Sequence, residues 1–162
     1  MKKILIPVII IVLGFIGLNL YDRTQSISIK NIQQYDESAI EILKEEKNDI
    51  LDMDIVLYKN SHDHICMMGL QNKKMIISSQ NNQTQSRDLD IYSFSHQDQT
   101  VGIIFGDNSK KHKEITYSID YSPNYTSYPT VTKTISVDPN DQYILEFVFV
   151  DGNSKTLTLP VK

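Results

Sequence analysis

From Met53 to the end of the chain, apolar and polar residues alternate with a period of two over short segments. Such alternation is typical of β-strands, because successive side chains of a strand point to opposite faces. The clearest case is Ile115-Tyr117-Ile119-Tyr121 against Thr116-Ser118-Asp120. Turn-forming clusters separate the segments, and Asp151-Gly152-Asn153-Ser154 is the strongest hairpin signal. The pattern predicts strands over Asp54–Lys59, His64–Leu70, Lys74–Ser79, Asp88–Phe94, Thr100–Phe105, Glu114–Tyr121, Thr130–Val137, Tyr143–Val150 and Lys155–Val161.

A different spacing precedes these strands. Asp36 has the character of a helix N-cap, and the apolar residues that follow it are Ala39, Ile42, Leu43 and Ile50, with Glu and Lys between them. This spacing predicts an amphipathic helix over about 36–50. A leading helix followed by short strands predicts an α+β fold that is mainly β, with an antiparallel β-sheet or small sandwich and the helix packed on or beside it.

The N-terminal segment is the most apolar part of the chain. Ile4 to Leu20 contains 17 residues, of which only Asn19 is polar, and Lys2 and Lys3 precede it. As a helix it spans roughly 25 Å, close to the thickness of a hydrocarbon core. Basic residues before the segment favour a cytoplasmic N-terminus. We therefore expect a single-pass transmembrane helix that holds the protein in the cell membrane, with the C-terminal domain extracellular.

The alternative for this segment is a cleaved signal peptide, which would give a secreted protein. A small-residue cleavage site of the A-x-A kind is absent, and Thr24-Gln25-Ser26 comes nearest to one. Both alternatives place the remaining chain outside the cytoplasm. The expected organisation is a cytoplasmic tip and anchor over 1–21, a linker over 22–34, and a single extracytoplasmic β-rich domain over 35–162.

Charge and cysteine content exclude some functions. The formal net charge is −4, and without Lys2 and Lys3 the chain has 14 basic against 20 acidic residues. A surface of this sign repels phosphate backbones and, in the same way, anionic lipid head groups, so nucleic acid is not an expected partner. Cys66 is the only cysteine, so the domain has no intramolecular disulfide and depends on its core for stability.

One group of residues has the chemistry of a metal site. On a strand, His62, His64, Cys66 and Met68 would point to one face. Imidazole and thiolate are ligands that copper and zinc prefer, so His62, His64 and Cys66 are candidate metal ligands. The alternative is that Asn60-Ser61-His62-Asp63 forms a turn, which leaves the histidines in solvent and Cys66 in the core.

Tyrosines form a second candidate site. Tyr121, Tyr125 and Tyr128 surround Pro123 and Pro129, and aromatic side chains on such a loop can stack on sugars or contact a partner protein. In the alternative interpretation, the tyrosines of this region close one edge of the core.

Catalytic signatures are absent from the sequence. There is no G-x-S-x-G, H-E-x-x-H, P-loop or Rossmann glycine motif. Asp88 and Asp90 could share a strand face as a carboxylate pair, but carboxylates in a polar stretch are usually solvated. No catalytic residue and no cofactor is predicted.

Two short stretches carry a resemblance. Ile55-Val56-Leu57-Tyr58-Lys59, followed later by Val101-Gly102-Ile103-Ile104-Phe105-Gly106-Asp107-Asn108, resembles a pattern in small membrane-anchored extracytoplasmic proteins of Bacillus-like Firmicutes. The resemblance covers about 35–120 and implies a Gram-positive envelope protein. It provides no catalytic residues that could be carried over.

These observations predict a non-enzymatic, membrane-tethered extracytoplasmic module that binds a cell-wall component, a peptide or a membrane protein. The alternative function is an envelope protein that binds copper or zinc through His62, His64 and Cys66.

Overall fold

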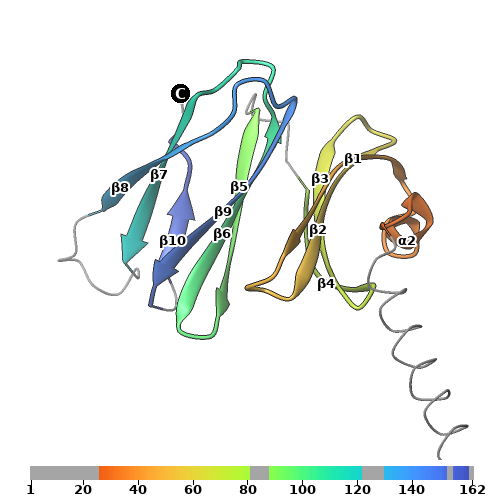
Figure 1. Ribbon diagram of the computed structural model, residues 1–162, viewed down its shortest axis with the longest axis horizontal. Coiled ribbons are helices and arrows are strands. Elements are labelled where there is room, and N and C mark those ends of the chain that lie inside the picture. Colours follow the sequence, from red (N-terminus) through yellow and green to blue (C-terminus); the bar gives the residue numbers. More distant parts are fainter. Residues whose placement is uncertain (1–25, 81–87, 122–129, 153–154, 161–162) are drawn as a thin grey trace, which may run out of the picture.

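The computed structural model describes residues 26–80, 88–121, 130–152 and 155–160, with the side chains of Gln80 and Tyr121 excepted. Three antiparallel sheets are stacked in layers in this part of the chain (Figure 1). The first sheet has the order β1 (Ala39–Asn48), β2 (Met53–Asn60), β3 (Ile65–Gln71), β4 (Lys74–Gln80). The middle sheet has the order β5 (Leu89–His96), β6 (Gln99–Asp107), β9 (Tyr143–Asp151). The third sheet has the order β10 (Lys155–Thr158), β7 (Glu114–Tyr121), β8 (Val131–Ser136).

The prediction of a mainly β, antiparallel, sandwich-like fold is confirmed. Each strand predicted from Asp54 onward corresponds to an observed strand, with ends that differ by a few residues. The predicted turns also fall between strands. For example, Asn72 and Lys73 connect β3 to β4 with φ angles of 50° and 63°, which is the geometry of a tight hairpin turn.

The predicted helix over 36–50 is wrong, because Ala39–Asn48 forms strand β1. Two register shifts in the pairing with β2 interrupt the alternation of β1, between Ala39 and Glu41 and between Ile42 and Lys44. As a consequence the apolar residues of β1 follow a spacing that resembles a helical one. Tertiary pairing with β2 outweighs the helix propensity of the Glu- and Lys-rich sequence.

The helix that the structure does contain is α2, a single turn over Ile29–Gln33. It lies on the outer face of the first sheet (Figure 1), within the range expected to be a linker. Ile27 and Ile32 are buried there, at 7% and 0% exposure. The packed part of the protein therefore extends back at least to Ile27.

Hydrophobic residues fill the space between the layers. The core between the first and middle sheets contains Leu51, Met53, Ile55, Leu57, Ile65, Met67, Ile77, Val101, Ile103, Phe105 and Leu145. The core between the middle and third sheets contains Leu89, Ile104, Ile115, Tyr117, Ile119, Ile144, Val148, Val150 and Leu157. A third cluster, beneath α2, contains Ile27, Ile32, Ala39, Val56, Tyr58, Cys66, Met68 and Leu70. The middle sheet is thus buried on both faces, and every residue of β6 from Thr100 to Gly106 is buried.

The expected membrane anchor over 4–20 lies outside the described residues. Within the described part, no helix has the length and apolar character needed to cross a bilayer.

Candidate functional site

The outer face of the third sheet consists almost entirely of hydroxyl side chains. Apolar residues of β7 and β10, such as Ile115, Ile119 and Leu157, point inward to the core. The register between the strands places the alternating residues together on the opposite face. These outward positions are Glu114, Thr116, Ser118, Asp120, Thr132, Thr134, Ser136, Thr156 and Thr158, and all are partly or fully exposed. We call this set the hydroxyl face.

Hydrogen bonds and pairing order the hydroxyl face. The Thr116 and Thr134 hydroxyls are 3.1 Å apart and hydrogen-bonded across β7 and β8. Ser118 is paired with Thr132 on one side and with Thr158 on the other, so three hydroxyls form a row across the sheet. Because the backbone of the three strands is held by its own ladder, the hydroxyls are presented on a rigid surface.

Two carboxylates border the hydroxyls. Thr130 donates a hydrogen bond of 2.8 Å to Asp120, and Glu114 is exposed at the other end of β7. Neither an apolar nor a basic residue occupies any outward position of the hydroxyl face. The face can therefore accept and donate hydrogen bonds to a polar, uncharged or cationic ligand, whereas it would repel an anionic one.

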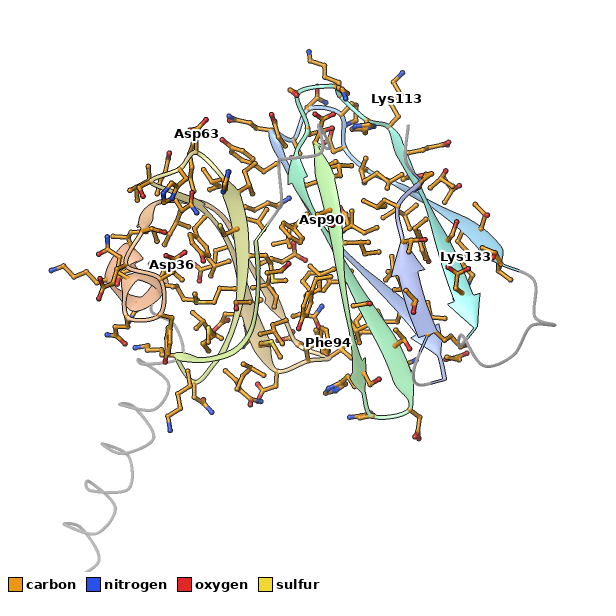
Figure 2. The ribbon with its side chains drawn as sticks, turned by 180° about the vertical axis from the view of Figure 1, so that it is seen from behind. Asp36, Asp63, Asp90, Phe94, Lys113 and Lys133 are labelled. Atoms are coloured by element: carbon orange, nitrogen blue, oxygen red, sulfur yellow. The ribbon has the colours of Figure 1, made fainter. Side chains whose placement is uncertain are left out.

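The third sheet, which carries the hydroxyl face, lies on the side of the molecule opposite α2 (Figure 1). Seen from behind, Lys133 lies on the third sheet, while Asp36, between α2 and β1, and Asp63, in the β2–β3 turn, lie at the other side (Figure 2). The middle sheet separates the two regions, and the candidate site is therefore remote from the end of the domain where the described chain begins.

Of the three candidate tyrosines, the structure describes only the backbone of Tyr121. Tyr121 is the last residue of β7, with its backbone opposite Lys155 of β10. Its side chain, together with Tyr125 and Tyr128, lies outside the described residues, in or next to the connection from β7 to β8. That connection joins two strands of the third sheet. Tyr117, by contrast, is buried at 4% exposure, and burial raises the pKa of its phenol.

The candidate metal ligands lie at the opposite side of the molecule, around the turn between β2 and β3. The buried Asn60 side chain accepts hydrogen bonds of 3.0 Å from the backbone N–H groups of His62 and His64. Asp63 has a φ of 68°, and β3 begins only at Ile65. The residues 61–64 thus form the turn that was the alternative prediction, with His62 exposed and His64 partly buried.

The two imidazoles and the thiol do not form a recognisable ligand set. The ring centroids of His62 and His64 are 6.2 Å apart, whereas Cys66 is buried at 1% exposure and its thiol contacts the His64 carbonyl oxygen at 3.9 Å. Among the described residues, no group of three or more His, Cys, Asp or Glu side chains has the geometry to hold a metal ion.

A hydrogen-bonded network surrounds Asp36 near this turn. Tyr58 donates to one carboxylate oxygen of Asp36 at 2.8 Å, and the Ser38 hydroxyl donates to the other at 2.5 Å. Burial would raise the pKa of Asp36, but the hydrogen bonds from Ser38 and Tyr58 and the nearby His62 outweigh it, so the pKa is lowered. Burial and the Asp36 carboxylate raise the pKa of the Tyr58 phenol, which stays a donor. The network attaches the start of β1 to β2.

This network leads to a prediction for Tyr58→Phe. Asp36 has a lowered pKa in the folded state, so its contribution to stability is present above the ordinary value of 3.8 and is lost as pH falls through the folded-state pKa. At pH 7 the variant is expected to lose about 1 kcal/mol of unfolding free energy, less than the roughly 1.5–3 kcal/mol of a buried hydrogen bond to a charged group, because Asp36 is partly solvated. The loss is expected to shrink below pH 3.8. Urea unfolding at neutral and acid pH measures both values.

Tyr35→Phe provides the matched control. The Tyr35 hydroxyl donates to the Lys73 carbonyl oxygen at an exposed position, and no carboxylate is involved. We expect a change of less than about 0.5 kcal/mol that does not vary with pH. If Tyr58→Phe showed the same flat profile as this control, the assignment of the pH dependence to Asp36 would be wrong.

The comparisons with known proteins give no relative. No protein-family model matches the chain, and neither the curated proteins nor the solved structures contain a significant match.

Proposed function

We propose that the protein is a membrane-tethered extracytoplasmic module that binds a neutral glycan of the cell wall on the hydroxyl face. The observation that carries this proposal is the composition of the face, in which seven of nine outward positions are Ser or Thr. Sugars present dense, alternating donors and acceptors, and hydroxyl side chains both donate and accept. This composition supports the sequence prediction of a wall component as partner.

Three further features favour a glycan over other wall polymers. The face has acidic but no basic outward positions, so phosphate-rich anionic polymers are disfavoured. Carboxylates such as Asp120 can accept two hydrogen bonds from neighbouring sugar hydroxyls. The connection that contains Tyr125 and Tyr128 starts from the same sheet, and tyrosine rings stack well on sugar faces.

The tethering part of the proposal rests on the sequence. The apolar run from Ile4 to Leu20 follows Lys2 and Lys3, as expected for a single-pass anchor with its C-terminal side outside the cytoplasm. A membrane tether and a wall-binding face on one chain would connect the membrane to the wall.

The test is a sedimentation assay with insoluble wall glycan from which anionic polymers have been removed. The full-length protein in mild detergent is compared with a variant that carries Thr158→Val, Ser118→Ala and Thr132→Val, the row across the sheet. Valine keeps the β-branched shape of threonine and removes only the hydroxyl. Loss of three hydrogen bonds of about 0.5 kcal/mol each predicts at least about tenfold weaker retention.

A double variant with Ser78→Ala and Ser95→Ala is the matched control, since these exposed serines lie on β4 and β5, away from the hydroxyl face. The fraction of this control that sediments with the glycan should equal that of the unchanged protein. Equal retention of the triple variant and the control, or no retention of the unchanged protein, would refute binding at the hydroxyl face.

The alternative function, binding of copper or zinc, is tested separately. Equilibrium dialysis of the full-length protein against each metal is compared with His64→Ala. Because the turn brings two imidazoles near each other and leaves Cys66 in the core, metal binding would have to involve His62 and His64 first. Equal metal uptake by both proteins would dismiss this alternative.

A further inference from the structure

The exposed large apolar side chains are distributed unevenly. Among the described residues they are Tyr35, Ile40, Ile50, Met75 and Ile76. Four of these five lie at or beside one end of the first sheet. Ile50 is in the turn between β1 and β2, and Met75 and Ile76 are the second and third residues of β4. Tyr35 is held at the same end, because its hydroxyl donates to the carbonyl oxygen of Lys73 in the β3–β4 turn.

We call this region the turn end of the first sheet, defined by residues 49–52 and 72–76 together with Tyr35. Both turns lie at the same end because β1 to β4 are antiparallel neighbours in chain order. The exposed fractions of Ile50 and Ile76 are 64% and 53%. Several large apolar side chains exposed at one end of a sheet are a feature of surfaces that contact a membrane or a partner protein.

Basic residues accompany these apolar side chains. Lys73 and Lys74 follow each other at the β3–β4 turn, and Lys30 is exposed on α2. Acidic residues are present in the other turn, where Asp49 and Asp52 are exposed, but Asp49 is paired with Lys47 at 3.7 Å. Within the turn end, Lys73 and Lys74 balance Asp49 and Asp52, so this region is neutral although the chain as a whole carries a net charge of −4. The repulsion from anionic head groups that the overall charge predicts therefore does not apply to this region, and Lys30 adds a positive charge beside it.

The described chain begins near the turn end. The backbone N–H of Ile27 donates to the Glu45 carboxylate at 3.2 Å, and Ile27 belongs to the same cluster as Leu70 near the end of β3. Figure 1 shows α2 beside the β3–β4 turn. Leu20, the last residue of the apolar run, precedes Ser26 by six positions, which can span at most about 20 Å.

We infer that the turn end of the first sheet docks onto the anionic phospholipid head groups of the membrane in which the same chain is anchored. This inference rests on the tether of the proposed function. A short connection keeps the domain near the bilayer surface, and the described chain begins near the turn end. Tyrosine, isoleucine and methionine side chains enter the interfacial region, while lysines contact lipid phosphates.

Docking in this orientation has a consequence for the proposed function. The third sheet, which carries the hydroxyl face, lies on the side of the molecule opposite α2 (Figure 1). With the turn end on the membrane, the three layers are held in one orientation relative to the bilayer. The hydroxyl face then meets the wall from a fixed position.

The chain contains no tryptophan, so a single introduced tryptophan reports on its own surroundings. Met75→Trp places the reporter at the turn end, and Thr134→Trp places the control on the hydroxyl face. Each full-length variant is reconstituted into vesicles of phosphatidylcholine and phosphatidylglycerol with bromine on the upper acyl chains. Flotation of the vesicles shows separately whether the protein is membrane-inserted.

The expected result is strong quenching of the tryptophan at position 75 and little quenching at position 134. Adding Lys73→Gln and Lys74→Gln to Met75→Trp should shift the docking equilibrium by about fivefold for each lysine. Vesicles of phosphatidylcholine alone should reduce the quenching in the same way. Ile50→Trp, in the other turn of the same end, repeats the test if Met75→Trp does not fold.

The outcomes separate the two proposals. If the protein floats with the vesicles but tryptophans at 75 and 50 are quenched no more than at 134, the docking inference is overturned while the tether stands. If the protein does not float, the tether itself fails, and docking onto the membrane of the same chain fails with it. Quenching that is unaffected by the lysine substitutions would overturn the role of the head-group phosphates.

Discussion

Replacing Gly106 with alanine is expected to lower the unfolding free energy by about 3–5 kcal/mol, enough to leave much of the protein unfolded at 37 °C. Gly106 has a φ of +147°, a conformation that residues with a Cβ rarely adopt. A Cβ at this position would overlap the Asp88 carbonyl oxygen and lie 3.0 Å from the Leu89 Cα. These atoms belong to the backbone, so they cannot move aside as a side chain would.

The strands around Gly106 prevent relaxation. Gly106 is paired with Leu89 of β5 on one side and with Ile144 of β9 on the other, and the neighbouring Asp107 N–H donates to the Asp88 carbonyl oxygen at 2.9 Å. Moving Asp88 would break this hydrogen bond and disturb the middle sheet, which is buried on both faces. Chemical denaturation of the full-length protein in detergent measures the loss.

Gly102→Ala is the matched control, four residues earlier on the same strand. Its Cβ would meet the Leu157 and Val148 side chains at 2.5 and 2.6 Å. Methyl groups at the ends of side chains can shift, and Gly102 does not require a positive φ, so we expect a smaller loss of about 1–2 kcal/mol. Equal losses for both variants would show that packing, rather than the backbone conformation at Gly106, accounts for the effect.

The strands could be predicted from the sequence because they obey local rules. The alternation of Ile115, Tyr117 and Ile119 with polar residues corresponds directly to one buried and one exposed face of β7. The stacking into three layers depends on long-range pairing, such as that of β6 with β9, and could not be read from local periodicity. The one available signal was the unbroken apolar run of β6, which is typical of a strand buried on both faces.

The wrong prediction of a helix in place of β1 has a specific physical cause. An edge strand with charged residues needs only a few inward apolar side chains, and charges such as Glu41 and Lys47 protect its outer edge from further pairing. The register shifts near Ala39 and Ile42 then remove the period of two. Residues with helix propensity and a broken alternation resemble an amphipathic helix until the pairing with β2 is known.

The hydroxyl face was missed for a related reason. Each strand showed its own polar residues, as in Thr116 and Ser118 of β7 or Thr132 and Thr134 of β8. Only the order β10-β7-β8 combines them into one surface, and β10 comes from the far end of the chain. The histidine turn, in contrast, depended on local chemistry, and its alternative prediction from Asn60 and Asp63 agrees with the structure.

The second large effect is expected for Asn108, a polar residue buried at 3% exposure. Its side-chain amide donates to the carbonyl oxygens of Asp138 and Asp141 at 3.2 and 2.9 Å, and its oxygen accepts from the His112 N–H at 2.8 Å. One side chain thus connects the β6–β7 segment to the β8–β9 turn. Asn108→Ala is expected to cost about 3 kcal/mol, because three partly buried backbone groups lose their partner at once.

Two substitutions separate hydrogen bonding from other effects of the change. Ser109→Ala alters the exposed neighbour and should change the unfolding free energy by less than about 0.5 kcal/mol. Asn108→Asp keeps an acceptor for His112 but replaces the donor with a charge that faces two carbonyl oxygens, so it should destabilise at least as much as alanine at pH 7. Protonation restores a donor, and the loss in Asn108→Asp should therefore decrease at acid pH whereas that in Asn108→Ala should not. A loss at Asn108→Asp that is small and independent of pH would mean that the two carbonyl oxygens do not need the amide, and that the turns are held together by their backbone alone.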